Sequence, residues 1–465
     1  MSDFAAAVDR YFRITERGST IRTEIRGGII TFLAMFYILA VNPMILSSTT
    51  GVDFQALVGA TALAACVSCL LMGLYARFPV ALAPGMGVNA FVAYTIVSEM
   101  GFDYYQALMV VFISGALFLL MAVTGIRTKI LQGIPMIIKC SIAAGIGFFI
   151  VVVGLYNSGI IEHGVGKAMT LGALGSPGVL LGILCIVVTI SLWFREHWSA
   201  VLVGIIVTVI VGYIGGQFFG WDTTVDGTSL IPGVGTAAVG DLMVTPNLSL
   251  FGDMFTEFTM FSGTLWPAFI VAIVSLTIVD VFDTTGTLIA IGTAAGIMDK
   301  DGNIEGNEKA LQVDAVASVF GAVAGTSTTT SFIESSTGIG VGAKTGLMAV
   351  VVGILFLFAM FFAPIFSLVT AACTVGALVL VGFMMIKSIK DVDWSDLVCV
   401  TTAFTTIFMM GLAGSITDGI AFGCLVYLIG MTVTGRFKEI PKMMLAMGIV
   451  FIAYLIINFT IIPYF

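Results

Sequence analysis

The sequence predicts an all-α, polytopic membrane protein in which about 14 transmembrane helices form two inverted repeats of seven. Three observations support this fold class: the scarcity of charge, the long apolar stretches, and a glycine motif that recurs in both halves. Of the 465 residues, 59% are hydrophobic and 10% are charged, whereas a soluble domain has about 25% charged residues. Because so few polar side chains cannot cover a globule of this size, lipid must solvate much of its surface.

The apolar stretches predict helices rather than barrel strands. A helix needs about 20 apolar residues to cross about 30 Å of hydrocarbon, whereas barrel strands alternate over about 10 residues. These stretches do not alternate, and backbone groups in lipid must be satisfied within the segment. The fifteen stretches are 28–47, 55–76, 84–98, 105–125, 133–157, 178–194, 199–217, 264–290, 311–325, 331–342, 346–364, 367–386, 395–412, 417–434 and 443–462. Because this is one more than two repeats of seven, we expect one of them to lie in the interface or to pair with a neighbour rather than span the membrane, and whether 443–462 spans is left open.

Lysine and arginine positions predict the orientation, because cytoplasmic loops hold the positive charge. If the N-terminus is cytoplasmic and the stretches alternate, only Lys167 of the 19 cations lies outside. The inner cations are Arg10, Arg13, Arg17, Arg22, Arg26, Arg77, Arg127, Lys129, Lys139, Arg195, Lys300, Lys309, Lys344, Lys387, Lys390, Arg436, Lys438 and Lys442. We therefore expect a multi-pass protein of the cell membrane with its N-terminus in the cytoplasm.

The same topology divides the chain into four parts. A cytoplasmic segment (1–26) precedes the first repeat (27–217), and an external loop (218–263) leads to the second repeat (264–465). The external loop contains no lysine or arginine, and its acids are Asp222, Asp226, Asp241, Asp253 and Glu257. Because each repeat holds an odd number of seven segments, the two repeats enter the membrane in opposite orientations.

A glycine motif occupies the third stretch of each repeat. Gly85–Ala90 reads GMGVNA and Gly338–Ala343 reads GIGVGA. Short, glycine-interrupted segments at matching positions of inverted repeats are typical of a transporter's substrate site. The alternative is that these glycines only let helices pack closely. Unwound segments leave backbone groups free for a solute, and the hydroxyls of 328–337, Thr330 among them, suit a flat polar solute.

Three acids lie deep in the predicted membrane segments. Asp280 and Asp283 stand three residues apart on one helix face, and Glu334 lies in the tenth stretch. Burying such a charge costs about 2.5–3.5 kcal/mol, which favours a functional role. Desolvation favours the protonated form of a carboxyl, so we expect Glu334, Asp280 and Asp283 to take part in proton coupling. The Asn89 amide either contacts the solute, as donor and acceptor, or caps a half-helix.

Other functions are disfavoured by the same sequence. The net charge of −8 leaves no basic face for nucleic acid. The seven cysteines lie in apolar stretches and are interpreted as packing residues, so we expect neither a metal nor another cofactor. An intramembrane aspartyl protease also needs two buried acids, but the nearest Gly-Asp motif ends at Asp241, in the external loop. We therefore expect a transporter rather than an enzyme.

At these residues the sequence resembles a known family. It is similar to the azaguanine-type hypoxanthine/guanine/adenine permeases, a branch of the nucleobase–ascorbate (nucleobase:cation symporter) transporter group, over essentially the whole chain. The most specific stretches are Arg17–Glu24, Pro84–Phe91, Asp280–Thr287 and Ile333–Gly338. The resemblance implies proton-driven import of purine bases, often by a homodimer. It also implies a core domain (segments 1–4 and 8–11) and a gate domain (segments 5–7 and 12–14).

The resemblance also implies residue roles. Asp280 and Glu334 would bind the base, Asn89 would assist, and Asp283 would be a nearby essential acid. The Asp280 carboxyl favours hypoxanthine and guanine over adenine, by analogy with the family's branches. We expect the substrate-lining neighbours to be Gly85, Gly87, Phe91, Thr330 and Ile333.

Two rival transport functions remain open. An anion transporter of the sulfate-permease type would share the fold, but an anion site should contain a cation rather than three acids. A passive channel differs from a symporter only in that it cannot accumulate solute against a gradient.

Overall fold

A computed structural model describes residues 3–124, 134–164, 167–225, 228–234, 243–256, 266–295 and 307–460. Several residues named above lie outside this part of the chain: Arg127, Lys129, Asp226, Asp241, Glu257 and Lys300. The side chains of Lys167 and Asp283 also lie outside the description, although their backbones belong to a strand and a helix.

The first half is helical apart from short strands. Its helices are α1 (Asp3–Phe12), α2 (Ile21–Met35), α3 (Ile38–Thr50), α4 (Phe54–Leu71), α5 (Met86–Ala90), α6 (Tyr104–Thr124), α8 (Met136–Asn157), α9 (Pro177–Phe194) and α10 (Ala200–Phe219). The π-helical segments η1 (Met72–Ala76) and η2 (Phe91–Glu99) continue α4 and α5. The strands are β1 (Leu82–Pro84), β2 (Ile161–Gly164), β3 (Lys167–Leu171), β4 (Thr224–Val225) and β5 (Thr228–Ser229).

The second half has one strand, β6 (Thr329–Ser331), in the described residues. Its helices are α11 (Asp253–Thr256), α12 (Trp266–Ala295), α13 (Asn307–Ala324), α14 (Ser335–Gly340), α15 (Gly346–Ala359), η3 (Met360–Phe362), α16 (Ala363–Phe366), α17 (Ala371–Ile386), η4 (Lys387–Asp391), α18 (Leu397–Ala413), α19 (Ile416–Val433), η5 (Phe437–Glu439) and α20 (Lys442–Thr460). The three sheets, β1–β6, β2–β3 and β4–β5, are all antiparallel pairs.

The helical, multi-pass fold class is confirmed. Within the described residues, nine helices are long and apolar enough to cross a membrane. The first predicted stretch, 28–47, is longer than expected, because α2 begins at Ile21 and a turn at Phe36–Tyr37 separates it from α3. The last stretch, 443–462, forms α20, which packs against α19 and α12.

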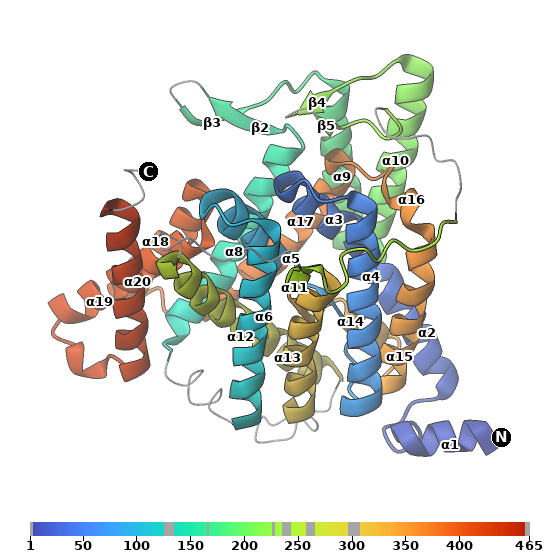
Figure 1. The fold of residues 1–465 in the computed structure, drawn as a ribbon, viewed down its shortest axis with the longest axis horizontal. Coiled ribbons are helices and arrows are strands. Elements are labelled where there is room, and N and C mark those ends of the chain that lie inside the picture. The colour runs from blue at the N-terminus through green and yellow to red at the C-terminus, as the bar shows by residue number, and fades with distance from the viewer. Residues whose placement is uncertain are drawn as a thin grey trace.

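The helices stand roughly side by side, with the small hairpins at one end (Figure 1). The N-terminal helix α1 lies at the opposite end from β2–β3 and β4–β5. α4 packs against α3, α13 and α15, whereas α8 packs against α17 and α18. The strands β1 and β6 lie among these helices, together with α5 and α14. α5 contacts both α8 and α12, whereas β6 and α14 contact α12.

Two residues near the N-terminus, Ser19 and Glu24, bind the segment between α14 and α15. The buried Glu24 carboxylate accepts hydrogen bonds from the Lys344 N–H (2.7 Å) and the Thr345 N–H (3.2 Å). Ser19 donates from its hydroxyl to the Gly342 carbonyl at 3.1 Å. The two bonds to Glu24 satisfy backbone N–H groups at and just before the N-cap of α15, where no partner within the helix exists.

Close contact of α2 with α14 depends on Gly338. A Cβ on Gly338 would lie 2.6 Å from the Gly27 carbonyl oxygen and would clash with the Thr31 hydroxyl. Gly338 therefore packs against a helix, in keeping with the close-packing interpretation of the glycine motif. Its neighbour Gly340 faces open space, because nothing lies within 4 Å of a Cβ built there.

We expect Gly338→Ala to lower the thermal unfolding temperature of the detergent-purified protein, because the backbone of α2 cannot move away without disturbing Glu24. Gly340→Ala is the matched control. It should leave the unfolding temperature unchanged or raise it, because alanine is favoured over glycine in a helix by about 1 kcal/mol. Equal unfolding temperatures for the two variants would show that α2 and α14 are not in tight contact.

Candidate functional site at two broken segments

Two short antiparallel strands, β1 and β6, pair with each other where the predicted broken segments lie. We call this β1–β6 pair the crossing. The paired residues are Leu82 and Ser331, Ala83 and Thr330, and Pro84 and Thr329. Beyond one end of the pairing, the Gly85 N–H donates to the Thr328 carbonyl at 3.0 Å. Beyond the other, the Phe332 N–H donates to the Ala81 carbonyl at 3.0 Å. This pairing satisfies backbone groups that an unwound segment would otherwise leave bare inside the membrane.

Each strand is followed directly by a short helix. α5 has five residues and α14 has six. The Ser335 hydroxyl, at the start of α14, accepts a hydrogen bond from the Ala81 N–H at 3.0 Å, beside β1. The third and tenth segments are therefore interrupted, as the glycine motif predicts, and they are joined to each other at the interruption.

Glu334 occupies the N-cap position of α14. Its carboxylate is half-buried, and Oε1 accepts a hydrogen bond from the Tyr37 hydroxyl at 2.7 Å. Tyr37 itself is buried at the turn between α2 and α3. The phenol of Tyr37, in the first segment, thus binds one carboxylate oxygen of Glu334. The sequence did not suggest this partner.

Asp280 is linked to the crossing by the Ser318 hydroxyl, which lies between its carboxylate and β6. The Asp280 side chain is buried in α12, and the Ser318 hydroxyl of α13 lies 3.1 Å from its Oδ2. The same hydroxyl lies 3.3 Å from the Thr329 carbonyl oxygen in β6. Asp283 belongs to the same helix, but its side chain is not described.

Asn89 is buried in α5 and is joined to the approach to β6. Its Oδ1 accepts a hydrogen bond from the Ser327 hydroxyl. Its Nδ2 has no hydrogen-bond partner among the described residues. Because Gly85 occupies the N-cap of α5, Asn89 does not cap this helix. A buried amide that lacks an acceptor is unusual in a folded protein, and the acceptor can come from a bound solute.

The remaining predicted site residues surround the crossing. A Cβ on Gly85 would lie 2.6 Å from the Thr330 hydroxyl, and one on Gly87 would lie 2.8 Å from Ile146 in α8. Thr330 is buried in β6 and Ile333, just after it, is half-buried.

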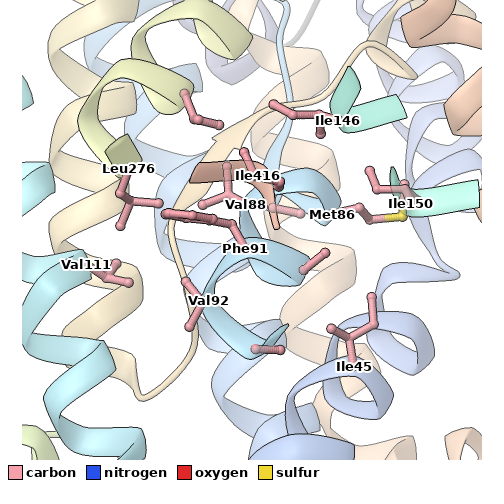
Figure 2. Packing of buried hydrophobic residues seen from close by; sticks show 14 of the residues in the cluster. Ile45, Met86, Val88, Phe91, Val92, Val111, Ile146, Ile150, Leu276 and Ile416 are labelled. Atoms are coloured by element: carbon pink, nitrogen blue, oxygen red, sulfur yellow. The ribbon is translucent and has the colours of Figure 1, made fainter. Parts of the chain in front are cut away.

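Phe91 is buried in the largest hydrophobic cluster. Figure 2 shows its ring pointing toward Leu276 of α12, with Val88 beside it. The ring therefore fills the space between the third and eighth segments, next to the residues of the crossing.

Asp314 is a buried acid that the sequence analysis missed. Its Oδ1 accepts from the Ser331 hydroxyl of β6 at 2.7 Å, and its Oδ2 accepts from the Thr284 hydroxyl of α12 at 2.5 Å. The signal was present, because Asp314 lies within the apolar stretch 311–325.

Asn42 of α3 was missed as well. Its Nδ2 donates to the Thr61 hydroxyl at 2.7 Å and to the Thr326 hydroxyl at 2.8 Å. This side chain links the first and second segments to the residues that precede β6.

We expect Asp314→Ala to destabilise the protein, because it strands the two buried hydroxyls of Thr284 and Ser331, at about 1–3 kcal/mol each. Asp314→Asn keeps one acceptor and should lie between wild type and Asp314→Ala in thermal unfolding temperature. Asp393→Ala changes an exposed loop acid and should have no measurable effect. Unfolding of Asp314→Ala at the wild-type temperature would mean that this carboxylate does not hold β6 in place.

Comparisons with known proteins agree with this architecture. The sequence profile of the xanthine/uracil permease type, described as the permease family, matches residues 22–422. The guanine/hypoxanthine permease PbuG of Bacillus subtilis is 40% identical over 456 residues, covering 96% of this chain and 99% of that protein. The adenine permease AdeQ of Escherichia coli is 38% identical, covering 95% of this chain and 94% of that protein.

Solved structures show the fold at lower identity. The transmembrane domain of the cyanobacterial bicarbonate transporter BicA matches with a TM-score of 0.58 and 15% identity, covering 88% of this chain and 96% of that chain. The murine anion transporter Slc26a9 matches with a TM-score of 0.55 and 13% identity, covering 88% and 68% of the two chains. Since the profile covers most of the sequence, the chain belongs to the permease family of the xanthine/uracil type, whose members are transport proteins rather than enzymes.

Proposed function

We propose that this protein is a proton-coupled symporter that imports purine nucleobases, with hypoxanthine and guanine as its principal substrates. One observation carries the proposal. The half-buried Glu334, the buried Asp280 and the buried amide of Asn89 all lie at a single crossing of interrupted membrane segments, in a chain similar over its length to purine permeases.

The chemistry of these groups suits a purine. A purine base is flat and carries donors and acceptors along its edges. The Nδ2 of Asn89 offers a donor. A protonated Glu334 carboxyl can donate one hydrogen bond and accept another. The Asp280 carboxylate can accept from a ring N–H, and Phe91 with Ile333, Gly85, Gly87 and Thr330 would shape the surrounding pocket.

The relatives support a purine but do not rank the bases. PbuG is named for guanine and hypoxanthine and AdeQ for adenine, at nearly equal identity. The preference for hypoxanthine and guanine therefore rests on Asp280, by analogy with the branches of the group. Adenine remains a further candidate substrate.

We place the protein in the cell membrane with its N-terminus in the cytoplasm. The cation distribution supports this orientation, and α1 and the hairpins lie at opposite ends of the molecule (Figure 1). Alternating access would come from rocking of a core domain (segments 1–4 and 8–11) against a gate domain (segments 5–7 and 12–14). A homodimer is the expected assembly.

An anion transporter is the principal rival, because BicA and Slc26a9 share this fold. Fold alone does not assign a function. No lysine or arginine side chain in the described part of the chain is hydrogen-bonded to Glu334 or Asn89. A site lined by carboxyl groups repels an anion unless those groups are neutral.

The substrate is tested by uptake of radiolabelled hypoxanthine into cells that lack their own purine permeases. We expect unlabelled hypoxanthine and guanine to compete, because they present the same ring edge. Sulfate, bicarbonate and dicarboxylates should not compete. Inhibition by an inorganic anion without inhibition by either purine would instead favour the anion transporter. A channel would equilibrate hypoxanthine but would not accumulate it.

Proton coupling is tested with Glu334→Gln, which keeps a donor and an acceptor but cannot titrate. We expect hypoxanthine binding that no longer varies with pH, and loss of uptake driven by an imposed pH gradient in proteoliposomes. Binding and protonation are linked reciprocally in the wild type. Glu16→Gln, an exposed change, should behave as wild type. Gradient-driven accumulation by Glu334→Gln would move the proton to another group, with Asp280 the first to examine.

A further inference from the structure

Tyr37 is a buried phenol inside the bundle that the mechanism above leaves without a role. It lies at the turn between α2 and α3, where its carbonyl accepts hydrogen bonds from the Ala40 and Val41 N–H groups, both at 3.0 Å. The side chain is 2% exposed. Its hydroxyl lies 2.7 Å from Glu334 Oε1, which is within the usual range for a strong O–H···O bond.

We propose that Tyr37 is the positioning residue for Glu334: its hydroxyl occupies Oε1, so that Oε2 alone exchanges the proton and meets the purine. This inference rests on the proposed function. A phenol facing a carboxylate can only donate to it, because an ionised carboxylate has no proton to offer. Once Oε1 accepts from Tyr37, an arriving proton goes to Oε2, which then becomes the donor toward the substrate.

The bond also affects which protonation state Glu334 adopts. A donor to the charged form of an acid stabilises that form, and a hydrogen bond to a charged group is worth more than one between neutral groups. Tyr37 therefore opposes the effect of burial, which favours the protonated acid. The balance lets Glu334 gain and lose a proton as its access to water changes.

Tyr37 and Glu334 are held as one unit. α2, which precedes Tyr37, is bound to the segment between α14 and α15 by Glu24, which accepts hydrogen bonds from the Lys344 and Thr345 N–H groups. Between these two points α2 packs on Gly338. A bond anchored at both ends persists while the rest of the bundle moves, as a proton-carrying pair requires.

Few other titratable groups surround Glu334 among the described side chains. On α12, Asp280 contacts Ser318, and on α13, Asp314 contacts Ser331 and Thr284. On α2, Glu24 accepts hydrogen bonds from backbone N–H groups between α14 and α15. Asp283 of α12 is not described beyond its backbone. Tyr37 is thus the titratable side chain that is hydrogen-bonded to Glu334 directly.

The test is an infrared titration of the ligand-free protein. The carbonyl stretch of protonated Glu334 is assigned as the band that disappears in Glu334→Gln. Tyr37→Phe removes the hydroxyl and keeps the ring. We expect the midpoint of this band to rise by about one pH unit in Tyr37→Phe, because the ionised form loses its donor. Hypoxanthine binding should then persist to correspondingly higher pH.

Tyr104→Phe is the matched control, because the buried Tyr104 hydroxyl also makes a 2.7 Å bond, to the Gly325 carbonyl. It should cost similar stability and leave the Glu334 band unchanged. Adding Tyr37→Phe to Glu334→Gln should not alter the pH dependence of binding any further.

An unmoved midpoint in folded Tyr37→Phe, or an equal shift in Tyr104→Phe, would overturn the proposal. A shifted band in a protein that binds no purine would uphold the Tyr37 role and reject the proposed substrate. The role of Tyr37 and the proposed purine substrate can therefore be rejected independently of each other.

Discussion

The fold depends on one constraint, that no backbone polar group can stay unsatisfied within the membrane. The third and tenth segments break their helices, and such breaks would expose backbone N–H and C=O groups. The antiparallel pairing of β1 with β6 resolves this, because each break supplies the partners for the other. The meeting of the two broken segments also brings Asn89, in α5, and Glu334, at the N-cap of α14, to the same part of the molecule.

A second requirement comes from the shortness of the helices at the break. A helix of six residues, such as α14, is not stable alone. α2 stabilises it along its length: Glu24 binds the residues that follow it, Gly27 allows close contact, and Tyr37 binds the acid that precedes it. The same contacts that hold α14 in place also orient Glu334, so the stability of α14 and the position of this acid depend on the same helix, α2.

The sequence was sufficient for the class of fold and for finding Asp280 and Glu334 near the interrupted segments, but it did not single out Asp314. Composition and apolar length predict membrane helices, and the glycine motif predicts the broken segments, because these signals are local along the chain. The pairing of β1 with β6 was not predictable, since three-residue strands have no detectable pattern. Tyr37 was missed for a similar reason: its bond to Glu334 joins residues 297 positions apart, and a tyrosine in an apolar segment gives no local sign of its partner.

The likeness to anion transporters extends to the fold alone. BicA and Slc26a9 share the architecture at 15% and 13% identity, so the architecture by itself does not assign a solute. In this chain, carboxyl groups from α12, α13 and the start of α14 lie beside the crossing, each bonded to a hydroxyl. Hydroxyl donors stabilise a carboxylate without adding a positive charge. A lysine or arginine partner would instead hold a carboxyl group in its charged form.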